Sequence, residues 1–394
     1  AGSLLDRDAA NGDLDLNADI TVKGAGAGKT VIDGGGIDRV FETGLAVDAA
    51  LADLTVTGGD STAGNSQEID LGGGVLNRSD ITLDRVALVA NKADGGGGLF
   101  SIPATNPTIR DSLIADNTAF EGGGLRIDSG ATIVNTTITG NALRTPRSED
   151  LATKPVGIVT LLIDEISGYG GGIDHRGGAL LKIVSSTITG NRALKGGGGI
   201  GAGQGYVPLS DALPLGHVEL RDTIVAGNAS TAGPQDCRTN EVEFVSLGHN
   251  LATDASCFLD AAGDRPQTDP RLGPLVDNGG PTRTRALLAG SPAVDAGSTQ
   301  CPKGDQRGIA RPQGAACDIG AFERAPVTTC RVALPARYRK QARSFDVLSG
   351  RKVLARKRKP AARVTVPAAR VTLKVRLRSG RTIRLKVRAT CRTT

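Results

Sequence analysis

Aromatic residues are scarce in this chain of 394 residues: they make up 3% of it, and Trp and Met are absent. Gly, in contrast, occurs 55 times. The core must therefore be built from Val, Ile, Leu and Ala in a narrow, regular space. Such a core favours stacked β-strands over the interior of a globular enzyme.

Long apolar runs are also missing. No run approaches the roughly 18 residues needed to cross a bilayer, so we expect no transmembrane segment. The chain begins at Ala1 without Met and shows no charged and then apolar leader. We therefore expect a processed, secreted chain, although trimming of a longer chain would give the same start.

Metal-binding cysteine patterns are absent as well, because the sequence contains no C-x-x-C motif and no Cys/His cluster. All six cysteines follow the repeats described below: Cys237, Cys257, Cys301, Cys317, Cys330 and Cys391. An even number of cysteines predicts disulfides and an oxidising compartment. Of the connectivities that six cysteines allow, we predict sequential pairing.

Acidic residues are nearly lacking at the C-terminal end. Residues 327–394 contain 21 Lys and Arg and a single acid, Asp346, which leaves 26 basic and 40 acidic residues in 1–326. The net charge of +6 therefore combines +20 in the tail with −14 in the rest. This split predicts two oppositely charged bodies.

One sequence motif recurs between Leu71 and Ser230: an apolar strand that ends in Gly-Asn or a similar pair of residues, followed by a run of glycines. Its copies are Ile81–Asn91, Pro107–Asn117, Ala131–Asn141, Leu181–Asn191 and Val218–Asn228. The Asn residues at 91, 117 and 141 are 26 and 24 residues apart. This period predicts a solenoid in which each coil buries its apolar residues only against its neighbours.

When the copies of this motif are aligned, the residues at equivalent positions form columns, and these columns predict how a coil is bent. The inward columns are Leu83, Ile109, Ile133, Ile183 and Leu220, and then Leu88, Ile114, Ile138, Ile188 and Val225. Their separation is odd, so a bend must lie between them, near the polar column Arg85, Asp111, Asn135, Ser185 and Asp222. For the final Asn column we predict a left-handed corner and amides that stack along the axis.

Residues 1–60 show the same short β-branched runs closed by Gly, and we place the first coils there. GAGAGKT at Gly24–Thr30 resembles a phosphate-binding loop. However, Lys23 stands where that motif requires Gly, and no helical pattern follows. We interpret the stretch as a tight turn between strands.

Two insertions interrupt the period, at Ala142–Tyr169 and at Gln204–Gly216. Both fall at turns, so we expect both to protrude, and long loops on a rigid scaffold often carry function. The alternative for the first is that Val156–Ile166 forms one more degenerate coil.

Beyond the repeats, residues 246–324 carry a dense set of turn-rich motifs. They include Asp269-Pro270, Leu272–Leu275, Asp277–Thr282, Ser291–Ala293, Asp295–Gly297, Asp305–Gly308, Arg311-Pro312 and Cys317–Glu323. This run resembles the C-terminal segment of bacterial secreted proteins with a choice-of-anchor Q domain. The resemblance extends over about residues 13–324 and implies a right-handed parallel β-helix.

The tail alternates apolar and basic residues about a Ser379-Gly380 turn, which predicts a β-hairpin with one basic face. That face comprises Lys374, Arg376, Arg378, Arg384, Lys386 and Arg388. With a Cys330–Cys391 disulfide, the tail resembles a small immunoglobulin-like β-sandwich. The expected organisation is thus an all-β chain: a β-helix over 1–236, its end with a disulfide-bearing choice-of-anchor Q-like segment over 237–326, and a basic sandwich over 327–394.

Catalysis would require carboxylates, or Ca²⁺ ligands with a base, converging on one face. Acids are scattered rather than aligned, and solvated turns explain them. The best candidates are Asp174, His175 and Arg176, although a His on a solvent turn is the simpler interpretation. We expect no metal and no cofactor; DGGGIDR at Asp33–Arg39 is like a calcium repeat but occurs once, so it does not support Ca²⁺.

These patterns favour a secreted or cell-surface structural or adhesive protein over an enzyme. Its basic tail would bind an anionic surface polymer, or the acidic body of another copy in a head-to-tail filament. Specific nucleic-acid binding is not expected. The alternative is a polysaccharide lyase or glycoside hydrolase of the pectin-lyase-like β-helix type, with its site at the insertions.

Overall fold

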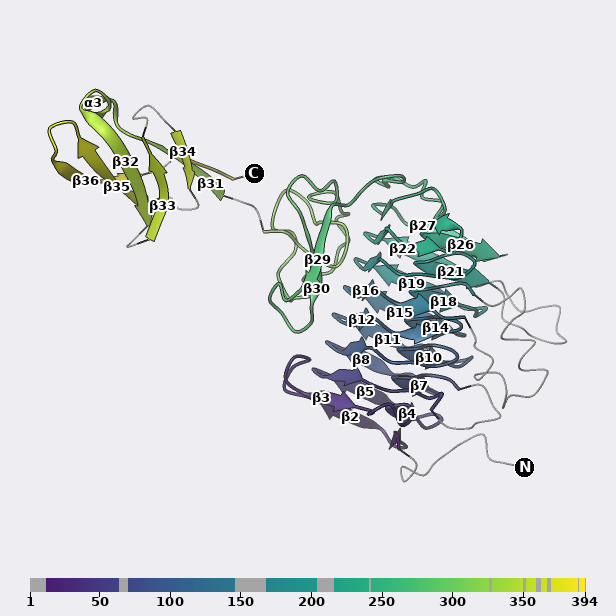
Figure 1. Ribbon diagram of the computed structural model, residues 1–394. Helices are drawn as coiled ribbons and strands as arrows, with labels where there is room; N and C mark the ends of the chain where they lie inside the picture. The colour runs from purple at the N-terminus through teal and green to yellow at the C-terminus, as the bar shows by residue number, and fades with distance from the viewer. Residues whose placement is uncertain are drawn as a thin grey trace, which may run out of the picture. The chain divides into compact units, whose positions relative to one another are not determined.

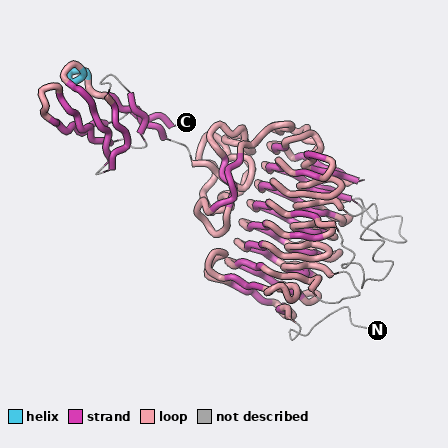
Figure 2. Tube along the Cα trace, in the orientation of Figure 1, coloured by secondary structure: helices cyan, strands magenta, loops and turns pink. Residues whose placement is uncertain are grey.

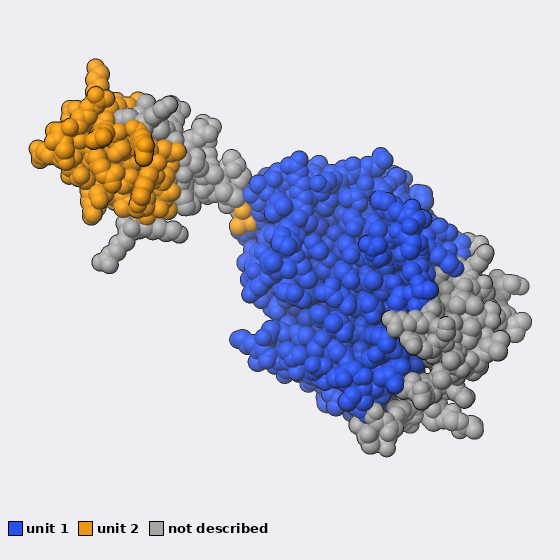
Figure 3. All heavy atoms as spheres, in the orientation of Figure 1, with its two compact units in different colours: residues 1–324 blue, residues 325–394 orange. Residues whose placement is uncertain are grey.

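The computed structural model describes residues 12–63, 70–145, 168–203, 216–240, 242–325, 328–349, 352–358, 363–366, 370–388 and 390–393. The chain divides into two compact units, residues 1–324 and 325–394 (Figure 3). Strands are the main regular structure of both units (Figure 2). Residues 146–167 and 204–215, the bulk of both insertions, lie outside the described residues, so their interpretation stays a prediction.

The first unit is a right-handed parallel β-helix, as the sequence predicts (Figure 1). Each coil gives one strand to each of three eight-stranded sheets. Sheet A contains β1 (Leu14–Leu16), β4 (Phe41–Thr43), β7 (Val75–Asn77), β10 (Leu99–Ser101), β14 (Leu125–Ile127), β18 (Ile173–His175), β21 (Ile200–Gly203) and β26 (Cys237–Asn240).

Sheets B and C are built in the same way. Sheet B contains β2 (Ile20–Lys23), β5 (Ala49–Ala52), β8 (Thr82–Asp84), β11 (Thr108–Arg110), β15 (Ala131–Val134), β19 (Leu181–Val184), β22 (His217–Arg221) and β27 (Glu243–Ser246). Sheet C contains β3 (Val31–Asp33), β6 (Thr55–Thr57), β9 (Ala87–Val89), β12 (Leu113–Ala115), β16 (Thr137–Thr139), β20 (Thr187–Thr189), β23 (Ile224–Ala226) and β28 (Leu251–Ala252). The pairs β13 (Thr118–Ala119) with β17 (Ala142–Leu143), and β24 (Ala229–Ser230) with β25 (Gly233–Pro234), add two short ladders.

The bend predicted between the two inward columns lies between sheets B and C. Its five polar residues, Arg85, Asp111, Asn135, Ser185 and Asp222, all have φ between +47° and +56°. A single left-handed residue turns the chain sharply, so the columns on either side can both face inward. Both columns are buried to 1% exposure or less, and burial of each such Leu or Ile stabilises the fold by roughly 1.5–3 kcal/mol.

The corner between sheets C and A contains the Asn column, and here the prediction was wrong in one respect. The left-handed residue is not the Asn but the residue before it: Ala90, Asp116, Gly140, Gly190 and Gly227. The Asn side chain instead points inward, because its amide satisfies backbone groups that the corner leaves without partners.

Amide stacking along the axis is confirmed. Asn117 Oδ1 accepts hydrogen bonds from the backbone N–H of Asn91 at 2.9 Å and from its Nδ2 at 3.0 Å. Asn117 Nδ2 donates in turn to Asn141 Oδ1 at 2.9 Å and to the Leu88 carbonyl at 3.0 Å. Asn141, Asn191 and Asn228 repeat the arrangement, and Asp236 Oδ1 accepts the last pair at 3.0 Å.

The glycine runs bring neighbouring coils into backbone contact. A Cβ added at Gly97 would lie 2.5 Å from the Gly123 carbonyl oxygen, and one at Gly123 would lie 2.6 Å from that of Gly171. Only glycine allows this approach. Each run leads directly into a sheet A strand, whose first residue is fully buried: Val75, Leu99, Leu125, Ile173 and Ile200.

A segment after the last coil, residues 266–324, folds back over the outer face of sheet C; we call it the covering segment. It includes the antiparallel hairpin β29 (Leu272–Val276) and β30 (Thr284–Leu287), seen beside the helix in Figure 1. Leu287, Ile319 and Phe322 share an apolar cluster with Ile224 and other outward residues of the last coils. The residues that carry the choice-of-anchor Q resemblance therefore lie largely in this cover.

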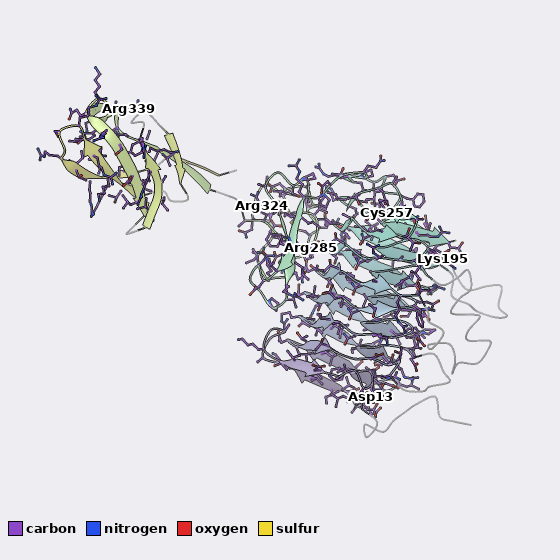
Figure 4. The ribbon with its side chains drawn as sticks, in the orientation of Figure 1. Asp13, Lys195, Cys257, Arg285, Arg324 and Arg339 are labelled. Atoms are coloured by element: carbon purple, nitrogen blue, oxygen red, sulfur yellow. A yellow bond between two sulfur atoms is a disulfide. The ribbon has the colours of Figure 1, made fainter. Side chains whose placement is uncertain are left out.

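Charged and polar groups fix the covering segment in place. Within the segment itself, Arg311 Nη1 lies 3.1 Å from Glu323 Oε2, and both side chains are fully buried. Arg285, labelled in Figure 4, places Nε 3.2 Å from Thr139 Oγ1 of sheet C. Asn135 Nδ2 donates to the Gly304 carbonyl at 2.9 Å, which joins the B–C corner to the same segment.

The second unit is a small antiparallel β-sandwich, as expected. One sheet has the order β34 (Arg363–Val366), β31 (Thr328–Ala333), β37 (Thr390–Thr393). The other has the order β33 (Lys352–Lys357), β32 (Ala342–Ser349), β35 (Arg370–Leu377), β36 (Thr382–Arg388). A short helix, α3 (Ala336–Arg339), leads into β32, and the core includes Phe345, Val347 and Leu373.

Two of the three predicted disulfides are confirmed, Cys237–Cys257 and Cys301–Cys317. The register of β31 and β37 places Cys330 directly opposite Cys391, although these two side chains lie outside the described ones. Directly opposed residues of an antiparallel pair have Cα atoms about 4.5–5.5 Å apart, which a disulfide can span.

We predict that Cys330 and Cys391 are bonded. Tryptic digestion without reduction should give one linked species of residues 325–331 and 389–392, which separates on reduction. Recovery of these peptides as free thiols, or linked to any other cysteine, would contradict the prediction.

We also predict that Asn141→Ala destabilises the fold by about 3–5 kcal/mol, because it leaves buried donors and acceptors on three neighbouring residues without partners. Since the chain contains no Trp, urea unfolding should be followed by circular dichroism. Asn240→Ala at an exposed strand end is the control and should change stability by less than about 0.5 kcal/mol.

Candidate functional site

The three residues that the sequence offers as a catalytic site are not on a solvent turn. Asp174 and His175 belong to strand β18 and Arg176 follows it, and all three are buried, with at most 7% exposure. The expectation of a turn was wrong because the recurring motif covers only the strands of sheets B and C, and these residues lie in the third strand of the coil, in sheet A. An aliphatic residue directly after each glycine run was the signal for that strand.

Asp174 and His175 also face opposite sides of sheet A, since neighbouring strand residues alternate. Asp174 lies in an outward column, where Arg176 Nε donates to both its carboxylate oxygens at 3.1 Å. Arg126 shares the cluster: it contacts Glu121, Asp128 at 2.8 Å and Asp174 at 3.8 Å. Arginine and carboxylate groups are thus paired with one another, as in a structural ion-pair network.

His175 lies inside the helix, fully buried. Its Nδ1 is 3.3 Å from the Ile127 carbonyl oxygen and its Nε2 is 3.1 Å from that of Ala179. Burial lowers the pKa of His175 below its usual value of 6.5, despite these two carbonyl contacts. The structure therefore pairs the acid Asp174 with the cation Arg176 and places the base His175 on the other face of the sheet.

The predicted basic face of the tail is confirmed as a structural feature. Val371, Leu373 and Val375 point into the sandwich core, so the alternating Lys374 and Arg376 point out. Arg376, Arg378, Arg384 and Lys386 are exposed and Lys374 is half-buried, while the side chain of Arg388 lies outside the described ones. Their proposed role in binding stays a prediction.

The register of the four strands aligns charges in a row across this face. Arg356 on β33 is opposite Asp346 on β32, Asp346 is opposite Lys374 on β35, and Lys374 is opposite Arg384 on β36. Arg376 Nη2 donates to Asp346 Oδ2 at 3.1 Å. Arg356 also belongs to this face, and sequence reasoning missed it because it joins only through strand pairing. From here on, the basic face means the five cations Arg356, Lys374, Arg376, Arg384 and Lys386, and it leaves out the predicted Arg378, which follows the end of β35, and Arg388, whose side chain is not described.

The basic face departs from the usual pattern of sheet surfaces. Lys374 and Arg384 are like charges directly opposite each other, which is destabilising. Asp346, the one acid of residues 327–394, is 5% exposed and is shared by several cations. Such a face attracts anions strongly because it retains an excess of positive charge.

Among the described residues, no helix is long and apolar enough to cross a membrane. In the same part of the chain, no group of three or more His, Cys, Asp or Glu side chains is arranged to hold a metal ion. No protein-family model, curated protein or solved structure matches the chain. Any function assigned to the candidate sites therefore has to be argued from the chemistry of their own residues.

We predict that His175 makes unfolding depend on pH below about 6.5. The neutral form is favoured in the fold, so its contribution is fully present above the unfolded pKa and is lost as pH falls toward the lowered folded pKa. Urea unfolding at pH 7.5, 6.5 and 5.5 should show wild type losing up to about 1.4 kcal/mol per pH unit more than His175→Gln. His217→Gln, whose parent side chain is 41% exposed, should follow wild type; a His175→Gln curve parallel to wild type would refute the assignment.

Proposed function

We propose that this protein is a secreted or cell-surface structural protein that holds an anionic polymer on the basic face of its C-terminal sandwich. The observation that carries the proposal is the cluster of cations on the outer side of one sheet, where Asp346 is the one acid among Arg356, Lys374 and Arg384. Lys374 and Arg384 lie on neighbouring strands at a spacing of about 4.8 Å, which suits a chain of repeated phosphate or carboxylate groups.

The charge of the second unit supports a binding role beyond solubility. Its excess of 20 positive charges is far above the roughly 2–8 that keep a small domain soluble. Because Lys374 and Arg384 repel each other, a bound polyanion would relieve a local destabilisation.

The secreted location rests on the disulfides Cys237–Cys257 and Cys301–Cys317, since such bonds persist in oxidising compartments. The resemblance of the covering segment to choice-of-anchor Q proteins supports the same assignment and a bacterial source. We infer from it a scaffold that displays the sandwich.

Self-association is a second candidate, favoured by the opposite charge of the two units. Residues 1–326 carry 40 acids against 26 bases, so the basic face of one copy is complementary to the acidic unit of another. Such a head-to-tail contact would form filaments. The enzyme alternative has no comparable support, because the candidate triad is buried and divided between two faces of a sheet.

We predict that Arg384→Glu/Lys386→Glu lowers affinity for poly(glycerol phosphate) or polygalacturonate at least tenfold at about 20 mM salt. Each substitution reverses a charge on the basic face, and Glu at 384 would pair with Lys374 and add roughly 0.2–1 kcal/mol of stability. Binding should be measured by fluorescence anisotropy with labelled polymer. Wild-type binding should weaken steeply as salt rises, because bound counterions are released on association.

A matched control is Arg337→Glu/Lys340→Glu, which makes the same charge change on exposed residues in and beside α3. It should lower affinity less than threefold. If both variants lose affinity equally, attraction is nonspecific and the basic face is not the site. If wild type binds neither polymer but sediments as salt-sensitive oligomers that Arg384→Glu/Lys386→Glu disperses, self-association replaces the proposal.

A further inference from the structure

A cleft of about 680 Å³ lies on the first unit, on the outer side of sheet C. One wall is the turn at residues 25–29, between β2 and β3. The other is the tip of the β29–β30 hairpin at residues 277–283. Both walls are visible in Figure 1, where the purple turn and the green hairpin tip approach each other along one side of the helix. The cleft lies outside the β-helix core, and it is on a different unit from the basic face.

The floor of the cleft is formed by outward residues of β6, β9 and β12, namely Thr55, Thr57, Ala87, Val89 and Leu113. Ala27 of the turn packs with Ala87 and Leu113 in a small apolar cluster. The floor is therefore a shallow aliphatic surface with Thr hydroxyls at its N-terminal end.

The same columns continue along sheet C, where the protein's own chain already covers them. Thr137, Thr139, Thr187 and Thr189 are exposed by 7% or less beneath the covering segment. Three of these hydroxyls bond to that segment. Thr187 Oγ1 accepts from the Ala321 N–H at 3.0 Å, Thr137 Oγ1 donates to Gln306 Oε1 at 2.6 Å, and Thr139 Oγ1 accepts from Arg285 Nε at 3.2 Å. This face thus binds polypeptide through Thr hydroxyls and aliphatic contacts. The same face continues into the cleft, where Ala87 and Leu113 are buried and Thr55, Thr57 and Val89 are half-buried.

The walls add positive charge. Lys29 and Arg283 are exposed on opposite sides of the cleft, and neither side chain has an ion-pair or hydrogen-bond partner in the described part of the chain. The only acid of the lining is Asp277, whose Oδ1 accepts the Gly279 N–H at 2.8 Å. An occupant with a carboxylate would therefore be favoured over a neutral or basic one.

The turn at residues 24–30 is not a phosphate cradle, in agreement with its interpretation as a tight turn. The N–H groups of Gly24 and Gly26 donate to sheet B carbonyls at 2.8 Å, and those of Lys29 and Thr30 donate within the turn at 2.8 and 2.9 Å. The Ala25 N–H donates to Thr30 Oγ1 at 2.9 Å. With these amides occupied, the turn contributes a wall and a cation rather than a nest for phosphate.

We propose that this cleft binds an extended peptide segment of a partner protein, one that carries aliphatic side chains next to a carboxylate. The aliphatic residues pack on Val89, the backbone bonds to the Thr57 hydroxyl, and the acid lies between Lys29 and Arg283. The Thr55 hydroxyl already donates to the Ala27 carbonyl and stabilises the wall instead. A saccharide is disfavoured, since no aromatic side chain lines the cleft to stack on a sugar ring.

The test uses the full chain and an array of octapeptides in which Leu or Val alternates with Asp or Glu. A matched array carries Asn or Gln at the acidic positions. Wild type should bind a subset of the acidic peptides at least fivefold more strongly than their amide counterparts. Val89→Trp, which fills the cleft from an outward, half-buried position of its floor, should lower that binding at least tenfold.

Lys29→Ala/Arg283→Ala should keep peptide binding but reduce the preference for acids below twofold. The control Lys23→Ala/Lys182→Ala removes two cations from sheet B and should match wild type. Circular dichroism melting of each variant separates loss of binding from loss of fold. The proposal is wrong if no peptide binds wild type, if Val89→Trp with unchanged melting binds as wild type does, or if trigalacturonate alone binds in a manner that Val89→Trp abolishes.

Discussion

The whole first unit depends on one constraint: a single coil cannot bury its own apolar residues. Each inward Leu or Ile has to be covered by the equivalent residue of the next coil, which requires strands to repeat at the spacing of a β-ladder. The corners must then repeat as well, because any side chain that widened one corner would separate the coils. Glycine at the close contacts and the inward Asn amides meet that requirement, the former by having no side chain and the latter by satisfying the corner amides.

The outer face of sheet C follows from the same constraint. Short Thr, Ala and Ile residues leave it flat enough for a second layer of polypeptide, and the covering segment occupies most of it. Within that layer Arg311 and Glu323 form a buried ion pair, and buried hydrogen bonds such as Thr137–Gln306 and Ala321–Thr187 join the layer to sheet C. Loss of one partner from such a pair is costly, because the other charge stays buried without compensation. The cover therefore has a defined position, and the cleft lies where it ends.

The second unit follows a different rule. Its core is an ordinary alternation of apolar residues, but its outer face retains cations opposite each other where a stable sheet would alternate charges. Departures from local rules tend to mark functional surfaces, since the surrounding fold has to compensate for them. The buried triad of sheet A shows the contrast: there, each arginine has acids around it, and the arrangement is explained by structure alone.

Much of this protein was determined by its sequence. The repeat predicts the β-helix, the odd spacing of Leu83 and Leu88 predicts a bend, and the alternation about Gly380 predicts the basic face, because each depends on local periodicity. Tertiary structure alone decided the rest. His175 faces inward because a third strand begins at Ile173, and Arg356 joins the basic face through strand pairing. The cleft exists because a hairpin more than two hundred residues along the chain returns to the turn at Gly24–Thr30, and no local pattern encodes a contact between such distant segments.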